Sequence, residues 1–311
     1  MRYDPGRDLR WLLLRPWVSI PRFVHVVWSL AGLVLVLLFQ AGSRDTAVQR
    51  KLASRILNTL TGLGPCFIKL GQALSTRPDL VRRDWLDELT RLQDDLPAFS
   101  HAIALATIEE DLGAPASELF EDFPDAPIAA ASLGQVYRAR LQGQSWVAVK
   151  VQRPNLTFIL RRDLVLIRMI AVLTAPLLPL NLGFGLGGIL DEFGRSLFEE
   201  IDYSLEAQNA ERFAALFADN EAVYVPRVER LLSPTRVLTT TWIDGAKMRD
   251  STELRNLQLD PSALIRTGVI CGLQQLLEFG YFHADPHPGN LFALPGRTGD
   301  LGHVGYVDFG M

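Results

Sequence analysis

The chain has 311 residues, with 35 acidic and 31 basic side chains and a formal net charge of −4. This mildly acidic balance lacks the basic surface that binds nucleic acid, so we expect no nucleic-acid partner. The hydrophobic fraction of 48% is high for a soluble protein and predicts a membrane-associated segment. The two cysteines, Cys66 and Cys271, form no CxxC pair, and we expect both to be reduced and packed.

Residues 23–39 form the apolar run FVHVVWSLAGLVLVLLF, in which His25 is the only ionisable side chain. This length is at the lower limit for crossing a hydrocarbon core. Tryptophans and arginines upstream of the run are typical of an interfacial anchor. Because basic residues flank the run on both sides, its orientation is not determined. An in-plane or hairpin anchor, a single span and a buried helix all remain open.

A second apolar region, 165–190, contains Arg168, Pro176 and Pro179 as well as several glycines. These residues interrupt a membrane helix, so we expect protein core followed by a loop.

Gly64-Pro65 precedes CFIKLGQALS, which predicts a helix with proline in its first turn. Lys69 and Gln72 are three residues apart and share one face of this helix. By itself, that pattern is also typical of a solvated surface pair. We expect residues 76–79 to end the helix and Asp84 to cap a second helix over 85–93.

From residue 127 the pattern becomes alternating and predicts three strands, the last two joined as a hairpin. Val147-Ala148-Val149-Lys150 matches the kinase strand whose lysine binds phosphates. The acidic segment 199–209 is expected to form one helix that supplies a glutamate partner for Lys150.

The alanine loop, residues 129–132 (AAAS), stands where a kinase has a glycine-rich loop. Alanine tolerates positive φ poorly, so we expect a changed grip on the nucleotide and suppressed protein phosphorylation. Residues 236–245 predict a strand running into a turn, with Trp242 and Ile243 where a kinase hinge holds adenine.

A predicted helix over 261–280 leads to HADPHPGN, residues 283–290, and then to Asp308-Phe309-Gly310. An aspartate five residues before an asparagine, followed by a second aspartate, is typical of phosphoryl-transfer sites. One carboxylate orients the attacking group, while the amide and the second carboxylate hold Mg²⁺. HxDxH also resembles metallohydrolase spacing, but the two prolines disfavour a helical metal site, and we expect His283 to be structural.

Together, FIKLGQ, AAAS, Lys150, Glu200-Ile201-Asp202, HADPHPGN and DFG resemble the UbiB family of atypical protein-kinase-like proteins. These are the aarF-domain kinases linked to ubiquinone biosynthesis. The resemblance runs from about residue 55 to 311 and is closest to cyanobacterial or plastid members. It implies an α+β, two-lobed, protein-kinase-like fold with an N-terminal helical extension.

The resemblance also implies residue roles. Lys69 and Gln72 would belong to an extension folded over the active site, where a protein substrate would otherwise enter. Glu200 and Asp202 would line that site, with Glu200 able to pair with Lys69. The remaining roles are Glu206 as helix partner of Lys150, Asp285 as catalytic-loop aspartate, Asn290 and Asp308 as Mg²⁺ ligands, and Ala129, Ala130, Ala131, Ser132, Lys150, Trp242 and Ile243 as the nucleotide-binding residues.

We therefore predict four segments: a membrane-associated segment 1–54, a helical extension 55–125, a kinase-like N-lobe 126–245 and a partial C-lobe 246–311. Because the sequence stops one residue after DFG, we expect an incomplete C-lobe, from a fragment or a truncated gene product.

The expected function is that of a membrane-associated atypical kinase or ATPase that uses ATP and Mg²⁺ in prenyl-quinone biosynthesis or lipid metabolism. Its active-site domain would face the cytoplasmic or stromal side. Expected partners are a membrane lipid or prenyl-quinone precursor, quinone-biosynthesis enzymes and a second copy of the chain. A non-catalytic nucleotide-binding scaffold is the main alternative. A conventional Ser/Thr kinase is disfavoured by the alanine loop and the Lys69 extension.

Overall fold

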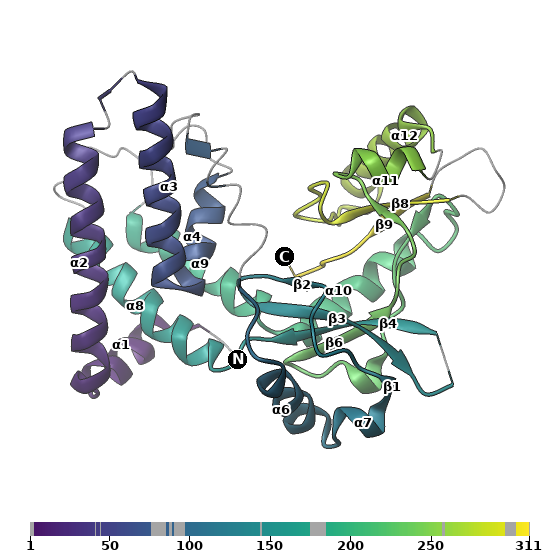
Figure 1. Ribbon diagram of the computed structural model, residues 1–311, viewed down its shortest axis with the longest axis horizontal. Coiled ribbons are helices and arrows are strands. Elements are labelled where there is room, and N and C mark those ends of the chain that lie inside the picture. Colours follow the sequence, from purple (N-terminus) through teal and green to yellow (C-terminus); the bar gives the residue numbers. More distant parts are fainter. Residues whose placement is uncertain are drawn as a thin grey trace. The chain divides into compact units, whose positions relative to one another are not determined.

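The structure is a computed structural model that describes residues 3–40, 42–43, 45–75, 85–86, 89, 97–143, 145–174, 185–256, 259–295 and 303–310 (Figure 1). The chain forms two compact units. The first comprises Met1–Ser100, Ile128–Gln135 and Gln152–Phe198, and the second comprises His101–Pro127, Val136–Val151 and Glu199–Met311. These units group the chain differently from the four predicted segments, whose boundaries stay a prediction.

The first unit is built mainly from helices, and short polar signals set their ends. The helices are α1 (Pro5–Leu13), α2 (Pro16–Gln40), α3 (Thr46–Leu63), α4 (Pro65–Ser75), α8 (Leu156–Thr174) and most of α9 (Leu186–Glu200). Asp45 caps α3 by accepting a hydrogen bond from the Ala47 N–H. Gly64, at φ 98°, ends α3, and Pro65 begins α4 at once, as the sequence predicts.

Helix α2 is longer than the predicted apolar helix over 23–39. It begins at Pro16 and contains Pro21, although proline costs a helix one backbone hydrogen bond. Hydropathy alone places the start too late, because a tertiary contact holds the first turns of α2. By length and composition α2 is able to cross a membrane, and only Val26 and Leu33 of its side chains are buried.

That contact is a buried ion pair. The Arg22 guanidinium donates to both carboxylate oxygens of Asp163 on α8, at 3.0 and 2.7 Å, and also to the Leu63 carbonyl at the end of α3. Arg162 donates to the same carboxylate at 2.8 Å. The Asp163 side chain is fully buried, so its charge must be paired. Arg22 therefore fastens α2, α3 and α8 together.

The apolar region 165–190 begins as protein core, as predicted. Val165, Leu166 and Ile167 are buried in α8. Residues 175–184 lie outside the described residues, and α9 begins at Leu186. Most of the helix predicted over 85–93, and its expected cap Asp84, also lie outside them.

The first part of the second unit is a β-sheet with helices beside it (Figure 1). The strands β1 (Phe120–Asp122), β3 (Gly134–Leu141), β4 (Trp146–Gln152) and β6 (Val237–Thr241) form a sheet in the order β1-β3-β4-β6. The predicted β3–β4 hairpin is present, and the first predicted strand is only β2 (Ala129–Ala130). Helices α6 (His101–Leu112) and α7 (Ala116–Leu119) precede β1. Arg236 bonds Asp111 at 2.7 Å and so ties α6 to the start of β6.

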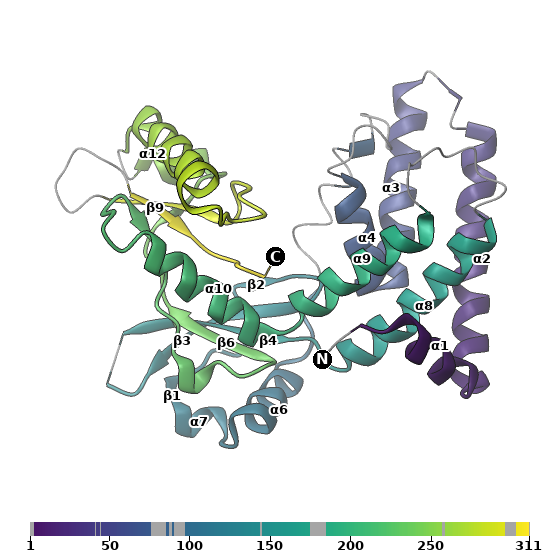
Figure 2. The ribbon, with the colours of Figure 1, turned by 180° about the vertical axis from the view of Figure 1, so that it is seen from behind.

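The rest of the second unit is a smaller sheet with helices beside it (Figure 2). Its strands run in the order β5 (Val223–Tyr224), β9 (His303–Tyr306), β8 (Leu291–Leu294) and β7 (Ala246–Lys247). Helices α10 (Tyr203–Leu216), α11 (Ser251–Asn256) and α12 (Pro261–Gln274) accompany them. A 3₁₀ turn, η3 (Arg230–Leu232), packs instead against β6. The helix predicted over 261–280 is α12 continued by a π-helical turn, η4 (Gln275–Phe279). Phe213, Tyr306 and Phe309 lie in the core between these elements.

The single helix predicted over 199–209 is wrong. Helix α9 ends at Glu200, and α10 begins at Tyr203. Asp202 lies between them with extended backbone, and its carboxylate accepts hydrogen bonds from the Ser204 N–H and hydroxyl. Aspartate favours a helix N-cap over a helix interior, because its short side chain satisfies a free backbone N–H there.

The Arg22 ion pair generates a stability prediction. Replacing Arg22→Ala should lower the free energy of unfolding by about 3 kcal/mol, because Asp163 loses its bidentate partner in a buried place. Urea unfolding followed by circular dichroism in mild detergent measures this change. The exposed Arg10 of α1 is the matched control, and Arg10→Ala should cost less than about 0.5 kcal/mol. Equal losses in the two variants would contradict a structural role for the pair.

Candidate active site

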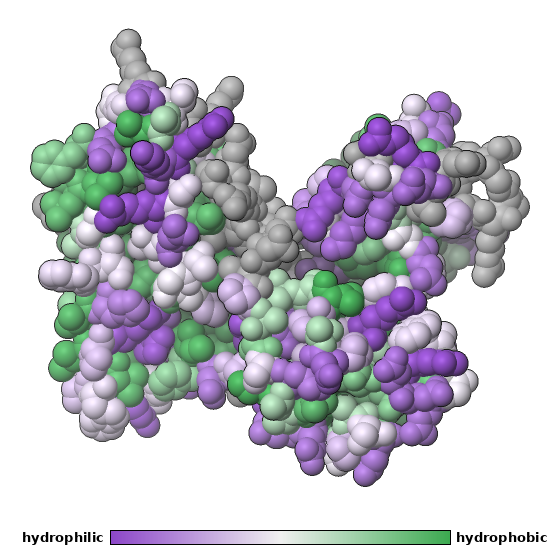
Figure 3. Space-filling view, in the orientation of Figure 1, coloured by the Kyte–Doolittle hydropathy of each residue, from purple (hydrophilic) through white to green (hydrophobic). Residues whose placement is uncertain are grey.

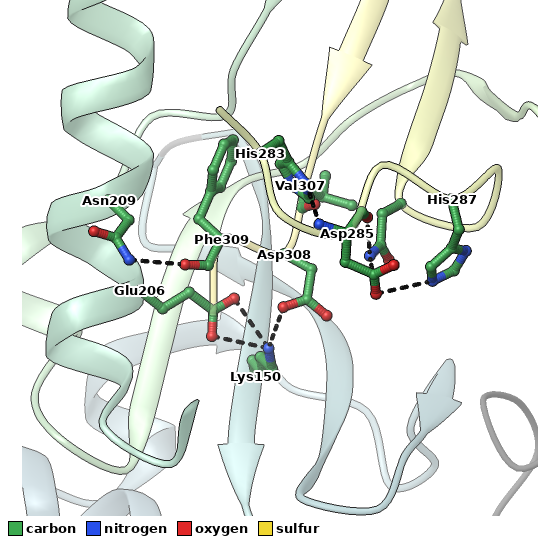
Figure 4. Close-up of polar contacts among 10 residues, drawn as sticks. Lys150, Glu206, Asn209, His283, Asp285, His287, Val307, Asp308 and Phe309 are labelled. Atoms are coloured by element: carbon green, nitrogen blue, oxygen red, sulfur yellow. Dashed lines mark hydrogen bonds and ion pairs between the residues drawn. The ribbon is translucent and has the colours of Figure 1, made fainter. Parts of the chain in front are cut away.

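Lys150 lies at the centre of a charged cluster in the second unit. Its Nζ donates to both carboxylate oxygens of Glu206, each at 2.9 Å, and lies 3.3 Å from Oδ1 of Asp308 (Figure 4). Strand β4 presents Lys150, and Glu206 lies in the first turn of α10, the helix that Asp202 caps. The lysine–glutamate pair expected from the sequence is therefore formed, with the DFG aspartate beside it.

Charge in this cluster is unbalanced, because one ammonium faces two carboxylates. Burial lowers the pKa of Lys150, but Asp308 and Glu206 raise it by more, so that it lies well above the ordinary lysine value. Burial raises the pKa of Glu206 to about 7 against the opposing effect of Lys150, and Asp308 adds to the rise. Excess negative charge favours bound protons, and for the same reason it favours a bound cation.

The backbone at Asp308 is held in an unusual conformation. Among the described non-glycine residues, only Asn155 and Asp308 have positive φ, and Asp308 is at 64°. Such a conformation is costly and persists only where the surrounding structure holds it. Conformations of this kind cluster at functional sites. Phe309 is buried, and its carbonyl accepts from Asn209 Nδ2 at 3.0 Å. The Tyr281 hydroxyl donates to the same Asn209 amide at 3.1 Å.

Asn209 and Tyr281 were not predicted as site residues. A signal for Asn209 is present in the sequence, because it lies three residues after Glu206 and so shares a face of α10. Tyr281 lies two residues before the catalytic-loop motif, but only the tertiary structure brings its hydroxyl to α10.

The catalytic-loop residues are organised around His283. The His283 ring is buried, its Nε2 donates to the Val307 carbonyl at 3.0 Å, and its Nδ1 accepts from the Asp285 N–H. Burial also lowers its pKa, which keeps the ring neutral. Asn290 donates from Nδ2 to the Asp285 carbonyl at 3.1 Å. This loop therefore presents the Asp285 carboxylate, while the Asn290 amide braces its backbone.

The HxDxH spacing does not produce a metal cluster in this fold. The His283 ring turns toward Val307 and away from the other two side chains of the motif (Figure 4). Across the described ranges, no group of three or more His, Cys, Asp and Glu side chains gathers where it could hold a metal ion.

The alanine loop lies in the first unit and is tied down by Arg153. The Ala131 N–H donates to the Gly134 carbonyl at 2.8 Å, and Arg153 Nε donates to the Ala131 carbonyl at 3.0 Å. Arg153 also donates to the Pro97 carbonyl at 2.6 Å. None of Ala129, Ala130, Ala131 and Ser132 adopts positive φ, so alanine fits this backbone without strain. The loop's contact with nucleotide stays a prediction.

The predicted hinge follows β6 in the second unit. The Trp242 N–H donates to the Trp146 carbonyl at 2.9 Å, and Ile243 is buried. The Arg138 guanidinium stacks on both tryptophans, at 4.5 Å from the Trp146 ring and 4.9 Å from the Trp242 ring. This stack fixes the start of the hinge and was not expected from the sequence.

The family-specific residues are divided between the units. Lys69 and Gln72 lie on α4 in the first unit, as the helix prediction requires. Glu200 and Asp202 lie in the second unit, where Glu200 contributes to raising the Glu206 pKa. The pairing of Glu200 with Lys69, and the cover over the site, stay predictions.

The raised pKa of Glu206 generates a prediction for stability. Its folded pKa of about 7 exceeds the ordinary value of 4.5, so the contribution of this group is fully present below pH 4.5 and is lost as pH rises through about 7. As pH rises from 5 to 8, the parent protein should therefore lose stability that the Glu206→Gln variant keeps. The difference in free energy of unfolding between the two should change in favour of the variant by on the order of 3 kcal/mol.

Paired urea titrations of parent and variant at several pH values measure this difference. Glu211→Gln on the exposed face of α10 controls for effects of the substitution itself. A relative loss of stability for Glu206→Gln as pH rises would mean that the ion pair outweighs burial.

Comparisons with known proteins identify the family of this chain. Residues 91–311 match the ABC1 atypical kinase-like domain. An uncharacterized Synechocystis protein is 50% identical over 312 residues, which cover 100% of this chain and 54% of that protein. The chloroplastic Arabidopsis thaliana protein ACTIVITY OF BC1 COMPLEX KINASE 1 is 44% identical over 94% of this chain and 42% of its own length.

A solved structure also resembles this one. It is that of Rv3197 from Mycobacterium tuberculosis in complex with erythromycin, with a TM-score of 0.55, 31% identity, and coverage of 85% of this chain and 65% of that one. The chain spans about half the length of the curated relatives it matches. Because the domain match covers most of the sequence, this chain belongs to the ABC1 family of atypical kinase-like proteins.

Proposed function

We propose that this protein binds Mg-ATP in its second unit and transfers or hydrolyses the γ-phosphate at a membrane surface, in support of prenyl-quinone or lipid metabolism. One observation carries the nucleotide part of the proposal, namely the bidentate Lys150–Glu206 pair beside Asp308. A lysine fixed in this way supplies a positioned charge for the α and β phosphates. Kinase-like relatives support ATP as the nucleotide.

The donor set fits Mg²⁺. Magnesium prefers oxygen ligands and is held in such sites by one or two protein groups together with phosphate oxygens. Asp308 supplies a carboxylate that is about half exposed, and Asn290 supplies an amide oxygen. The excess negative charge around Lys150 supports cation binding there. When bound, Mg²⁺ would neutralise charge on the β and γ phosphates.

Asp285 is the proposed acceptor for the proton of the attacking group. Its carboxylate is partly exposed, and its backbone is fixed by His283 and Asn290. The attacking group would be water in an ATPase, or the hydroxyl of a lipid or prenyl-quinone precursor in a kinase.

The exposed face of α2 supports membrane association. Large apolar side chains recur along it at intervals of three, four or seven residues, at Trp17, Ile20, Val24, Trp28, Leu35 and Leu38. Figure 3 shows hydrophobic surface along the edge where α2 lies. The opposite face is held by Arg22, so α2 offers lipid one face only. This arrangement favours an in-plane anchor, with tryptophans at the interface.

Placement and partners are further parts of the proposal. Chloroplastic relatives support a plastid-type membrane, with the second unit on the cytoplasmic or stromal side. We propose a membrane lipid or prenyl-quinone precursor as substrate and quinone-biosynthesis enzymes as partners. A homodimer stays a prediction.

The nucleotide part is tested by thermal unfolding with Mg-ATP. The parent protein should gain several degrees in Tm with saturating Mg-ATP, because a ligand that binds only the folded state stabilises it. Adding EDTA, or the substitution Asp308→Asn, should remove most of the gain. ATP turnover is then measured with lipid vesicles, and Asp285→Asn should lower kcat by about 100-fold or more.

Each outcome has a distinct meaning. A parent protein without a Tm shift would contradict nucleotide binding altogether. A shift without turnover, unchanged by Asp285→Asn, would leave the non-catalytic nucleotide-binding scaffold. Phosphorylation of generic protein substrates would instead favour a conventional protein kinase.

The membrane part is tested by vesicle flotation. The double substitution Trp17→Ser and Trp28→Ser should weaken binding to anionic lipid vesicles by about tenfold or more, because two aromatic side chains lose their apolar contact. Leu231→Ser is the control, since this leucine of η3 is 95% exposed and lies in the second unit. Equal binding by parent and double variant, at unchanged Tm, would contradict α2 as the anchor.

A further inference from the structure

His287 is a titratable residue of the catalytic loop to which the phosphoryl-transfer proposal gives no role. It lies two residues after Asp285 and is partly exposed, with its ring beside the Asp285 carboxylate (Figure 4). Its Nε2 lies 3.7 Å from Oδ2 of Asp285. That separation is slightly longer than a hydrogen bond, and contacts of this kind tighten when a substrate occupies the site.

The other ring nitrogen is already engaged. The Gly289 N–H donates to His287 Nδ1 at 2.9 Å. A nitrogen that accepts a hydrogen bond carries a lone pair, so in the neutral ring the proton must be on Nε2. The backbone of Gly289 therefore fixes the tautomer and aims an N–H group at the Asp285 carboxylate.

Gly289 is fitted to this ring in a second way. A Cβ built at Gly289 would lie 2.5 Å from His287 Cε1 and 2.9 Å from Nδ1. Any side chain at this position would push the ring out of its place. The Asn290 N–H also donates to the His287 carbonyl at 2.9 Å, which closes the turn around the imidazole. The turn formed by residues 287–290 therefore fixes both the position and the tautomer of the His287 ring.

We propose that His287 is a positioning residue for phosphoryl transfer. Its Nε2–H holds the Asp285 carboxylate toward the attacking hydroxyl or water, while Gly289 holds His287. The proton of the attacking group passes to Asp285, so no bond to His287 forms or breaks. This inference rests on the proposed function, because it assigns His287 to the same reaction.

Two substitutions separate this role from support of the loop alone. The Asn side chain places its carbonyl oxygen near the position of Nδ1, so His287→Asn keeps the acceptor for Gly289 and loses the donor to Asp285. The Gln side chain reaches the position of Nε2, so His287→Gln keeps a donor to Asp285 and loses the acceptor for Gly289. We expect His287→Asn to lower kcat for Mg-ATP turnover about 10- to 100-fold, at unchanged KM and nucleotide-induced Tm shift. His287→Gln should recover most of kcat.

The opposite order, with Asn active and Gln inactive, would overturn the proposal and leave His287 as a support for the loop. Gly289→Ala gives a third arm. It should reproduce the kcat loss of His287→Asn with the His287 side chain still present, because the added methyl group displaces the ring. An active Gly289→Ala protein with a displaced ring would also overturn the proposal.

A measurement without turnover separates this inference from the proposed function. In nucleotide-free protein labelled with ¹⁵N-histidine, the His287 resonances, assigned by their loss in His287→Asn, should show unprotonated Nδ1 and protonated Nε2 at pH 8. Asp285→Ala should shift the Nε2 resonance, and Gly289→Ala should release the tautomer. Two results would overturn the inference even if Mg-ATP turnover were observed: a protonated Nδ1, or an Nε2 chemical shift that is the same in the parent protein and in Asp285→Ala. The fixed tautomer and the Asp285 response would support the contact between His287 and Asp285 even if the parent protein proved inactive, in which case the proposed function alone would have failed.

Discussion

The structure of the second unit depends on the ion pair between Lys150 and the buried Glu206, with Asp308 beside it. Glu206 is almost fully buried and Lys150 largely so, and each would be costly there without the other. Asp308 adds a second carboxylate on the exposed side. Three distant segments of the chain, β4, α10 and the DFG segment, must therefore meet at one point. The cluster therefore carries one negative charge in excess, which favours a bound cation.

Backbone geometry around this cluster follows from the same requirement. Asp308 turns its carboxylate to Lys150 in a left-handed conformation, which aspartate tolerates better than most residues. The strain is held by Phe309, whose ring is buried in the core and whose carbonyl is bonded by Asn209. Helix α10 thus supplies both the partner of Lys150 and the clamp on DFG. Asp202 matters to both, because it caps that helix.

The catalytic loop is held by two histidines, each with its tautomer fixed by a backbone group. His283 is buried, donates to the Val307 carbonyl and so joins the loop to the strand that leads into DFG. His287 is partly exposed and accepts from the Gly289 backbone. Asp285 lies between them in sequence and is contacted by both. In the first unit, Arg22 has a comparable organising role, since it pairs a buried Asp163 and holds one face of α2.

Local signals in the sequence were sufficient for much of this protein. Alternation identified β4 with Lys150, the Gly64-Pro65 step marked the start of α4, and motif order predicted that Asp285, Asn290 and Asp308 belong to one site. These features depend on neighbouring residues, so a short window contains their cause.

The tertiary structure alone decided the rest. It broke the predicted 199–209 helix at Asp202, began α2 at Pro16, and brought Asn209, Tyr281 and Arg138 to the site. Most of these outcomes depend on a partner that is distant in the sequence. The break at Asp202 depends on whether that aspartate lies inside a helix or caps one. The catalytic-loop motif was readable as chemistry from the sequence, but the tautomers of its two histidines follow only from which backbone groups the fold places against their rings.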